Sequence, residues 1–247
     1  MPRLLPLVGL LLLCTSRVWA QGGAAPPREA GVLAQRLGET TWGMEELFAG
    51  KVEEMTIRLR VEELDRDGNV KHLQERVDRV RMKDGQQRRE VLQGSRDGED
   101  TTQALRQELE ERQRRGQGRT EFNSVNLPFA AAYLGRHRFW LEGAGPAEPH
   151  RLRLRFEPRA DKAPSVHQGE ALVEADTGRL VRLSYSPSQL PDMARRVDVR
   201  MDFRSQPGVG QVLDTLYVDA EGGLLFYKKH LRITAHYSDL VPAGATR

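Results

Sequence analysis

The sequence predicts a mainly β (α+β) fold: a strongly curved antiparallel sheet, or half-barrel, of about ten strands with a few helices covering its concave face. The first observation is strict alternation of polar and apolar residues, as in Arg-Leu-Arg-Leu-Arg-Phe at 151–156 and again at 197–203. Successive side chains of a strand point to opposite sides of a sheet, so this pattern is typical of a half-buried strand. The second observation is the scarcity of helical patterns, because a large sheet with little helical cover tends to curl.

Short turn sequences separate the predicted strands. The strands are 55–61, 70–82, 138–142, 151–157, 168–175, 179–185, 196–204, 211–218 and 224–237. The predicted turns are Asp67-Gly68, Asp84-Gly85, Asp176-Thr177-Gly178, Pro207-Gly208 and Glu221-Gly222-Gly223. Glycine tolerates the positive backbone angle that a tight turn requires. Such short, sequential connections favour antiparallel neighbours, although the stretch 70–82 is polar on both faces and has the weakest strand pattern.

The first twenty residues have the pattern of an export signal. Met1 to Arg3 gives a positively charged start, an apolar run follows, and Val18 and Ala20 are the small residues that a signal peptidase needs. The apolar run is about half as long as a membrane-spanning helix requires. We therefore expect cleavage after Ala20, with an uncleaved anchor as the alternative.

Cleavage would change the character of the chain. It removes Cys14, the single cysteine, so the mature protein is expected to have neither a disulfide nor a thiol nucleophile. It also removes two arginines, which leaves the basic residues nearly balanced by the 35 acidic ones. This charge balance and the expected export both argue against a nucleic-acid partner.

The sequence predicts one domain at 30–240, preceded by a flexible tether at 21–29 and followed by a tail at 241–247. Within residues 28–47, apolar residues at helical spacing predict one or two helical segments that break near Gly38.

A charged helix is predicted as an insertion at about 97–115. Asp100 is expected to cap it, with Gln103 at the spacing of a capping box. Its apolar stripe is thin and consists of Ala104, Leu105 and Leu109. A thin stripe is typical of a solvated surface helix, and a mobile cover over a groove is the alternative.

Motifs for chemistry are not apparent in the sequence. Asp65 to Asn69 resembles the start of a calcium loop, but Val70 stands where glycine is required and Arg76 where the final glutamate is required. The histidines lack the spacing of metal ligands, and Gly94-Ser95-Arg96 is not a nucleophile elbow. We therefore expect no enzyme, no metal and no cofactor.

The apolar strand positions allow two interpretations. A half-buried antiparallel sheet normally packs such a face against its own core. With few helices to cover it, the face could instead hold a ligand in an apolar groove. The expected lining of this groove is Met55, Ile57, Leu59, Phe156, Met201, Phe203 and Ile233.

Several short segments support a family resemblance. They are Leu127-Pro128-Phe129, the strand 139–143, the segment Arg155 to Pro158, the hairpin 169–180 and the closing strand 228–240. In their order, the chain resembles bacterial outer-membrane lipoprotein-sorting-like proteins. These belong to the fold superfamily of the periplasmic lipoprotein carrier and the sigma-factor regulator. The resemblance implies a periplasmic half-barrel whose apolar concave face is lidded by helices and accepts acyl chains; it assigns no individual residue.

The leading hypothesis is a periplasmic, non-enzymatic protein that binds lipid or lipoprotein acyl chains, in outer-membrane lipoprotein sorting or envelope lipid handling. Envelope proteins are further expected partners, and no membrane-spanning segment is expected after signal cleavage. The alternative is a protein-interaction or envelope-stress sensor module with a filled core. A third hypothesis is an envelope enzyme with an unrecognised site.

Overall fold

The computed structural model describes residues 27–42, 47–83, 86–115, 127–143, 148–160, 166–190, 193–224 and 227–244. Its helices are α1 (Pro27–Thr40), α3 (Thr102–Arg114) and α4 (Ala131–Leu134). Its strands are β1 (Val52–Leu64), β2 (Val70–Lys83), β3 (Gln86–Arg96), β4 (Glu99–Asp100), β5 (His137–Gly143), β6 (Arg151–Pro158), β7 (His167–Glu174), β8 (Leu180–Pro187), β9 (Ala194–Gln206), β10 (Gly210–Leu224) and β11 (Tyr227–Pro242).

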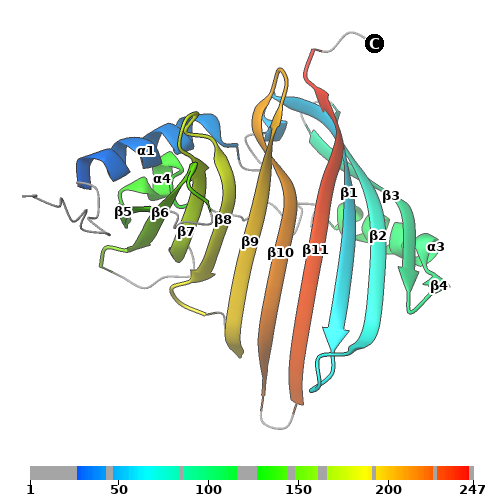
Figure 1. Cartoon of the computed structure of the whole chain (residues 1–247). Coiled ribbons are helices and arrows are strands. Elements are labelled where there is room, and N and C mark those ends of the chain that lie inside the picture. Colours follow the sequence, from blue (N-terminus) through cyan, green and yellow to red (C-terminus); the bar gives the residue numbers. More distant parts are fainter. Residues whose placement is uncertain are drawn as a thin grey trace, which may run out of the picture.

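All these strands form one open antiparallel sheet in the order β4-β3-β2-β1-β11-β10-β9-β8-β7-β6-β5 (Figure 1). Neighbours in the sheet are neighbours in the chain, with one exception: β1 pairs with β11. The predicted antiparallel sheet with few helices is therefore confirmed. Strands β3 and β4 were not among the nine predicted ranges, and they bring the number of described strands to eleven.

The predicted alternation separates an apolar face from a polar face. Directly opposed residues form a row across eight strands: Leu59, Ala235, Leu216, Met201, Leu183, Ala171, Leu154 and Leu141. Every member of this row is buried. The neighbouring arginines of the same strands take the other face, where Arg200 and Arg232 are exposed and Arg153 is half-buried. Because the side-chain period of a strand is two, this register places the core on one side of the sheet.

Helices α1 and α4 cover the end of the sheet that contains β5 (Figure 1). The inner side of α1 has Ala30, Ala34 and Leu37 fully buried. The predicted break near Gly38 is wrong, because α1 continues to Thr40. Glycine is required there by packing: a Cβ atom on Gly38 would overlap the carbonyl oxygen of Phe129.

Strand β2 pairs with β1 and β3 despite its polar sequence, and it buries a charged group. The Asp78 side chain is completely buried, and its Oδ2 accepts hydrogen bonds from Arg76 Nε and Arg89 Nε, each at 2.9 Å. Arg89 comes from β3, so the ion pair also joins the two strands. A buried carboxylate held by charge-assisted hydrogen bonds avoids the cost of an unpaired buried charge.

The charged helix is shorter than predicted. Residues 97–98 form a turn, residues 99–100 form β4, and α3 begins at Thr102. Asp100 Oδ1 accepts a hydrogen bond from the backbone N–H of Thr102 at 2.8 Å, but the N-cap position is Thr101. The predicted capping box of Asp100 with Gln103 is therefore wrong. Helix α3 packs on β3, where the Leu105 side chain lies against Gly94.

Most predicted turns are confirmed. Gly68, Gly178 and Gly208 have positive φ angles of 86°, 71° and 76° between their strands. The predicted turn at 221–223 is wrong, because β10 continues to Leu224. The turn at 84–85 lies outside the described residues.

The described residues begin at the start of α1, so the predicted signal at 1–20 lies outside them. Helix α1 begins within the predicted tether at 21–29, and β11 extends two residues into the predicted tail at 241–247. Within the described ranges, no helix has both the length and the apolar character needed to cross a membrane.

Replacing Gly38 with alanine should destabilise the fold by about 1–3 kcal/mol, because the new methyl group must displace the Phe129 backbone. Gly31 is the matched control, since it lies in the same helix with no atom within 4 Å of its Cβ position. Gly31→Ala should be neutral or stabilise by up to about 1 kcal/mol through helix propensity. Denaturant unfolding measures both; equal effects would contradict the proposed packing of α1.

Strand alternation predicts opposite tolerance at adjacent positions of β11. Ile233→Asp should cost several kcal/mol, because it places a charge among apolar side chains. Arg232→Gln should cost less than about 1 kcal/mol, since Arg232 is exposed and its ion-pair distances are 3.7 Å. Chemical denaturation of the two variants gives the comparison, and similar losses would exclude this strand register.

Candidate binding face of the sheet

The structure brings all seven predicted lining residues to the apolar face. Five of them are buried members of the core: Met55, Ile57, Leu59, Phe156 and Met201. Phe203 and Ile233 are half-buried and pack against that core. The seven residues therefore belong to one connected apolar cluster, and their role as the lining of a ligand groove stays a prediction.

Beyond the buried row, the apolar face continues as a half-buried surface. We call this surface the apolar strip; it consists of Val61, Val197, Val199, Val218, Ala220, Leu231 and Ile233. Its first row is Val61–Ile233–Val218–Val199, and its second row is Leu231–Ala220–Val197. Each row consists of directly opposed residues on adjacent strands, so the side chains share one face. Tyr185 extends the first row onto β8.

Strand length explains why this strip is only half-buried. Strands β1, β9, β10 and β11 have 13 to 16 residues, whereas β5 to β8 have 7 or 8. The long strands run past the ends of the short ones, away from α1 (Figure 1). The first row lies where the pairing of β9 with β8 ends, at Tyr185–Val199, and the second row lies beyond it. Fewer described elements therefore pack against the strip than against the buried row.

A pair of charges marks the outer end of the strip. Glu63 lies directly opposite Leu231, and its Oε2 is 3.2 Å from Lys229 Nζ. Alternation places both charged residues on the same face as the strip. The apolar surface is thus bordered by one carboxylate and one ammonium group, which are both partly exposed to solvent.

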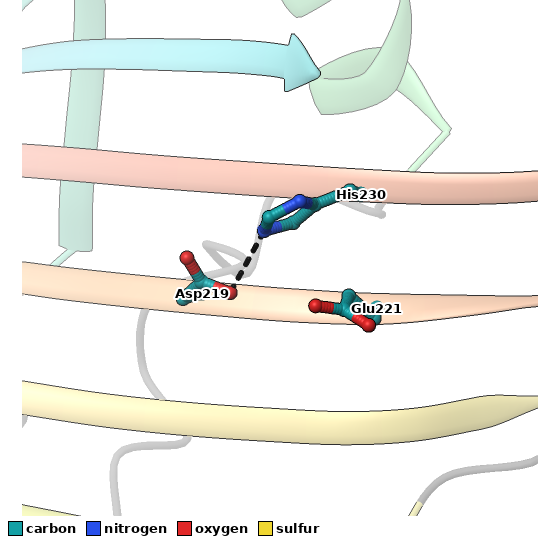
Figure 2. A group of neighbouring side chains, drawn as sticks. All are labelled: Asp219, Glu221 and His230. Carbon is teal, nitrogen blue, oxygen red and sulfur yellow. Dashed lines mark hydrogen bonds and ion pairs between the residues drawn. The ribbon is translucent and has the colours of Figure 1, made fainter. Parts of the chain in front are cut away.

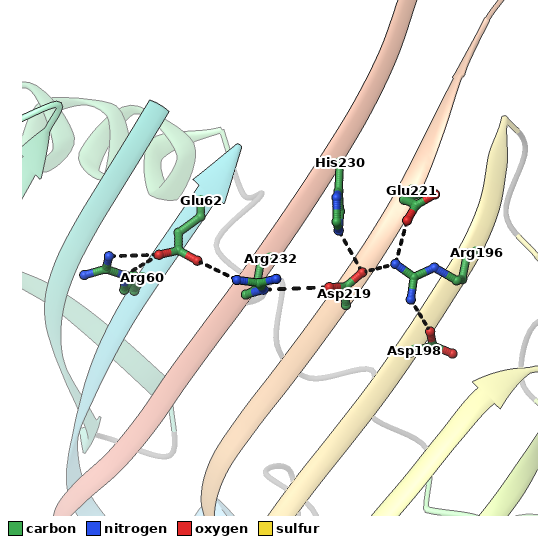
Figure 3. Close-up of polar contacts among 8 residues, drawn as sticks. All are labelled: Arg60, Glu62, Arg196, Asp198, Asp219, Glu221, His230 and Arg232. Carbon is green, nitrogen blue, oxygen red and sulfur yellow. Dashed lines mark hydrogen bonds and ion pairs between the residues drawn. The ribbon is translucent and has the colours of Figure 1, made fainter. Parts of the chain in front are cut away.

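The opposite face has a chain of ion pairs from β1 to β9 (Figure 3). Glu62 lies 2.8 Å from Arg60 and 3.7 Å from Arg232, which in turn lies 3.7 Å from Asp219. Arg196 on β9 extends this network, because it lies 2.5 Å from Asp219, 2.6 Å from Glu221 and 2.8 Å from Asp198. Exposed ion pairs of this kind stabilise a fold only slightly.

Three possible metal ligands meet within this network: Asp219, Glu221 and His230, whose ligand atoms lie within 4.8 Å of one another (Figure 2). His230 Nε2 is 2.9 Å from Asp219 Oδ1. Arg196, however, donates hydrogen bonds to both carboxylates and already supplies a positive charge between them. The sequence did not reveal this cluster, because His230 reaches the acidic residues only through the pairing of β10 with β11.

A buried pair of histidines was also missed by the sequence analysis. His137 Nδ1 donates to the Tyr133 carbonyl at 2.9 Å, and His137 Nε2 accepts the backbone N–H of His167 at 3.2 Å. These two contacts require the neutral ring, and burial lowers the pKa of His137. His167 stacks on Tyr185 at 4.3 Å, and burial raises the pKa of that tyrosine.

A scan against models of protein families gave no match, and a search of curated proteins gave none either. Among solved structures, MucB in complex with MucA(peri) is similar over 88% of this chain and 100% of its own, at 12% identity and a TM-score of 0.24. The di-domain ARO/CYC BexL from the BE-7585A biosynthetic pathway is similar over 90% of this chain and 84% of its own, at 14% identity and a TM-score of 0.17. Both TM-scores are too low to establish a shared fold, so family membership stays a prediction.

His137 should make the fold sensitive to acid. Because its folded pKa lies below the unfolded value of about 6.5, the unfolded chain binds the proton more readily. The free energy of unfolding should therefore fall as the pH drops through about 6.5 toward the lower, folded pKa. His137→Gln should be less stable at pH 7 but should lose less stability between pH 7 and pH 5. An NMR titration that shows the His137 ring protonated at or above pH 6.5 would contradict this assignment.

Proposed function

We propose that the protein is a non-enzymatic binding protein of the periplasm that holds an acyl chain of a lipid or lipoprotein on the apolar strip. The observation that carries this proposal is the strip itself. It continues the core across four long strands and stays half-buried among the described residues. Its side chains are aliphatic, so they offer burial to a ligand and no group for acid–base or nucleophilic chemistry.

The dimensions of the strip fit a long hydrocarbon chain. From Val199 on β9 to Val61 on β1, the first row spans three strand spacings, or about 14 Å. An extended acyl chain lying along this row would contact one side chain on each strand. Each methylene removed from water contributes about 0.8 kcal/mol, so a few contacts per strand provide useful affinity.

The charges at the end of the strip fit an amphiphile. The Glu63–Lys229 pair lies beside the second row and is partly open to water. A ligand with its chain on the strip could keep a charged or polar headgroup at this border. Such an arrangement avoids burying an unpaired charge.

Export to the periplasm is supported by the leader-like residues 1–20. A role in lipoprotein sorting or envelope lipid handling follows from combining that location with an acyl-chain ligand. Envelope proteins that deliver or receive the ligand are further proposed partners.

A second candidate function is a protein-interaction or envelope-stress sensor module. The observation that favours it is the burial of five of the seven predicted lining residues in a filled core. In this case the apolar strip would receive an apolar segment of a partner protein.

A fluorescent fatty acid should bind the purified protein at micromolar concentration, which corresponds to about −8 kcal/mol, and phospholipid should displace it. Leu231→Asn should weaken binding about tenfold by placing an amide on the strip. Thr234→Asn is the matched control, because it places the same amide on the opposite face of β11. It should leave binding unchanged.

Two results would contradict the acyl-chain proposal. One is the absence of saturable fatty-acid binding to a folded protein. The other is an equal loss of binding in the Leu231 and Thr234 variants. Thermal unfolding of each variant confirms that it is folded before its binding is compared.

A further inference from the structure

A cavity of about 510 Å³ lies on the polar face of the sheet, opposite the apolar strip, and extends from β6 to β11. This volume is within the range of small-molecule sites. Neither the sequence motifs nor the proposed acyl-chain site accounts for it. Its composition therefore indicates what it could bind.

The register of the strands brings the polar side chains of the cavity together in two rows. One row of directly opposed residues is Arg155, Glu170, Ser184, Arg200 and Tyr217. A second row contains Gln168, Ser186, Asp198, Asp219 and Arg232, in which Ser186 Oγ donates to Asp198 Oδ1 at 2.8 Å. These ten residues line the cavity together with Gly169, Tyr185, Val199 and Val218, which alternate with them along the same strands. The lining thus comes from six strands that one continuous sheet holds in place.

The charges of this lining cancel. Three guanidinium groups, those of Arg155, Arg200 and Arg232, face three carboxylates, those of Glu170, Asp198 and Asp219. An anionic ligand would lie close to the carboxylates, and a cationic ligand close to the guanidinium groups. An uncharged ligand avoids both penalties.

The remaining groups favour a ligand with many hydroxyls. Guanidinium groups only donate hydrogen bonds and carboxylates only accept them, whereas the Gln168 amide and the serine hydroxyls do both. Each hydroxyl of a sugar also donates and accepts, so one saccharide could satisfy this mixed lining at several points. A ligand with acceptors alone, or with donors alone, could not.

An aromatic side chain adds a flat surface. The guanidinium carbon of Arg200 lies 3.9 Å from the centroid of the Tyr217 ring. This cation–π stack orders both side chains in the wall of the cavity. We propose that the polar-face cavity is a binding site for an uncharged mono- or disaccharide unit.

The test is a titration of the full chain with N,N′-diacetylchitobiose and with maltose, followed by NMR. At least one of these neutral disaccharides should give saturable binding in the millimolar range. Gln168→Ala should weaken it about fivefold, as expected for the loss of about one hydrogen bond. Gln93→Ala is the matched control, because Gln93 lies on the same face but lines a different cavity. It should leave binding unchanged.

Charged sugars provide the second arm. Glucosamine and glucuronate should bind more weakly than glucose, because each carries a charge that the balanced lining does not compensate. Tighter binding of a charged sugar, no saturable binding of either disaccharide, or equal losses in the two glutamine variants would overturn the proposal.

The saccharide and acyl-chain sites can be distinguished experimentally. They lie on opposite faces of the same strands, so Gln168→Ala should not change fatty-acid binding and Leu231→Asn should not change saccharide binding. Either proposal can therefore fail while the other stands.

Discussion

The pairing of β1 with β11 is the constraint on which the rest of the sheet depends. It joins β1 to β4 to the seven strands that follow α4. The register from Leu64–His230 to Val52–Pro242 brings together residues that are more than 160 positions apart. A contact of such sequence separation carries a large loop-closure cost, which only a long and well-packed pairing can offset. Without it, both β1 and β11 would be exposed edges, and exposed edges favour aggregation.

This central pairing also positions the apolar strip. Val61 joins the strip only because it lies opposite Ile233, and the Glu63–Lys229 ion pair at its border depends on the same register. A slip of one residue would turn the strip toward the polar face and expose the buried row. The proposed acyl-chain site is therefore a consequence of how the two ends of the chain meet.

Much of the fold could be predicted from the sequence, because alternation within a strand is a local signal. It predicted nine of the eleven described strands, their faces and most of the turns, including those at Gly68 and Gly208, but it did not predict β3 and β4. Features that depend on contacts between distant segments were not predictable in this way. Examples are the close packing of Gly38 in α1 against the Phe129 carbonyl and the burial of Asp78 in β2 beside Arg89 of β3.

The candidate site was predicted to the same extent and for the same reason. The alternation of side chains placed all seven predicted lining residues on one face of the sheet. Which of them are buried depends on their position along the strands. Met201 lies in the fully buried row, whereas Val199, two residues earlier on the same strand, lies in the strip. The burial of a position on the apolar face depends on the lengths of the neighbouring strands and on the position of α1. The sequence of a single strand contains neither of these two pieces of information. The cluster of Asp219, Glu221 and His230 likewise requires the register of two strands.

The two proposed sites lie on the same strands, but they use side chains that point to opposite faces of the sheet. On β11, Leu231 and Ile233 face the strip while Arg232 between them lines the polar cavity, and β9 and β10 alternate in the same manner. A ligand on either face would bind only the sheet in this register, so each would stabilise the same pairing by mass action. Ligands that do not touch one another should stabilise it additively. The alternation of side chains thus gives one sheet two different surfaces. One face presents aliphatic side chains to a hydrocarbon chain, and the other face presents hydrogen-bonding groups to a polar ligand.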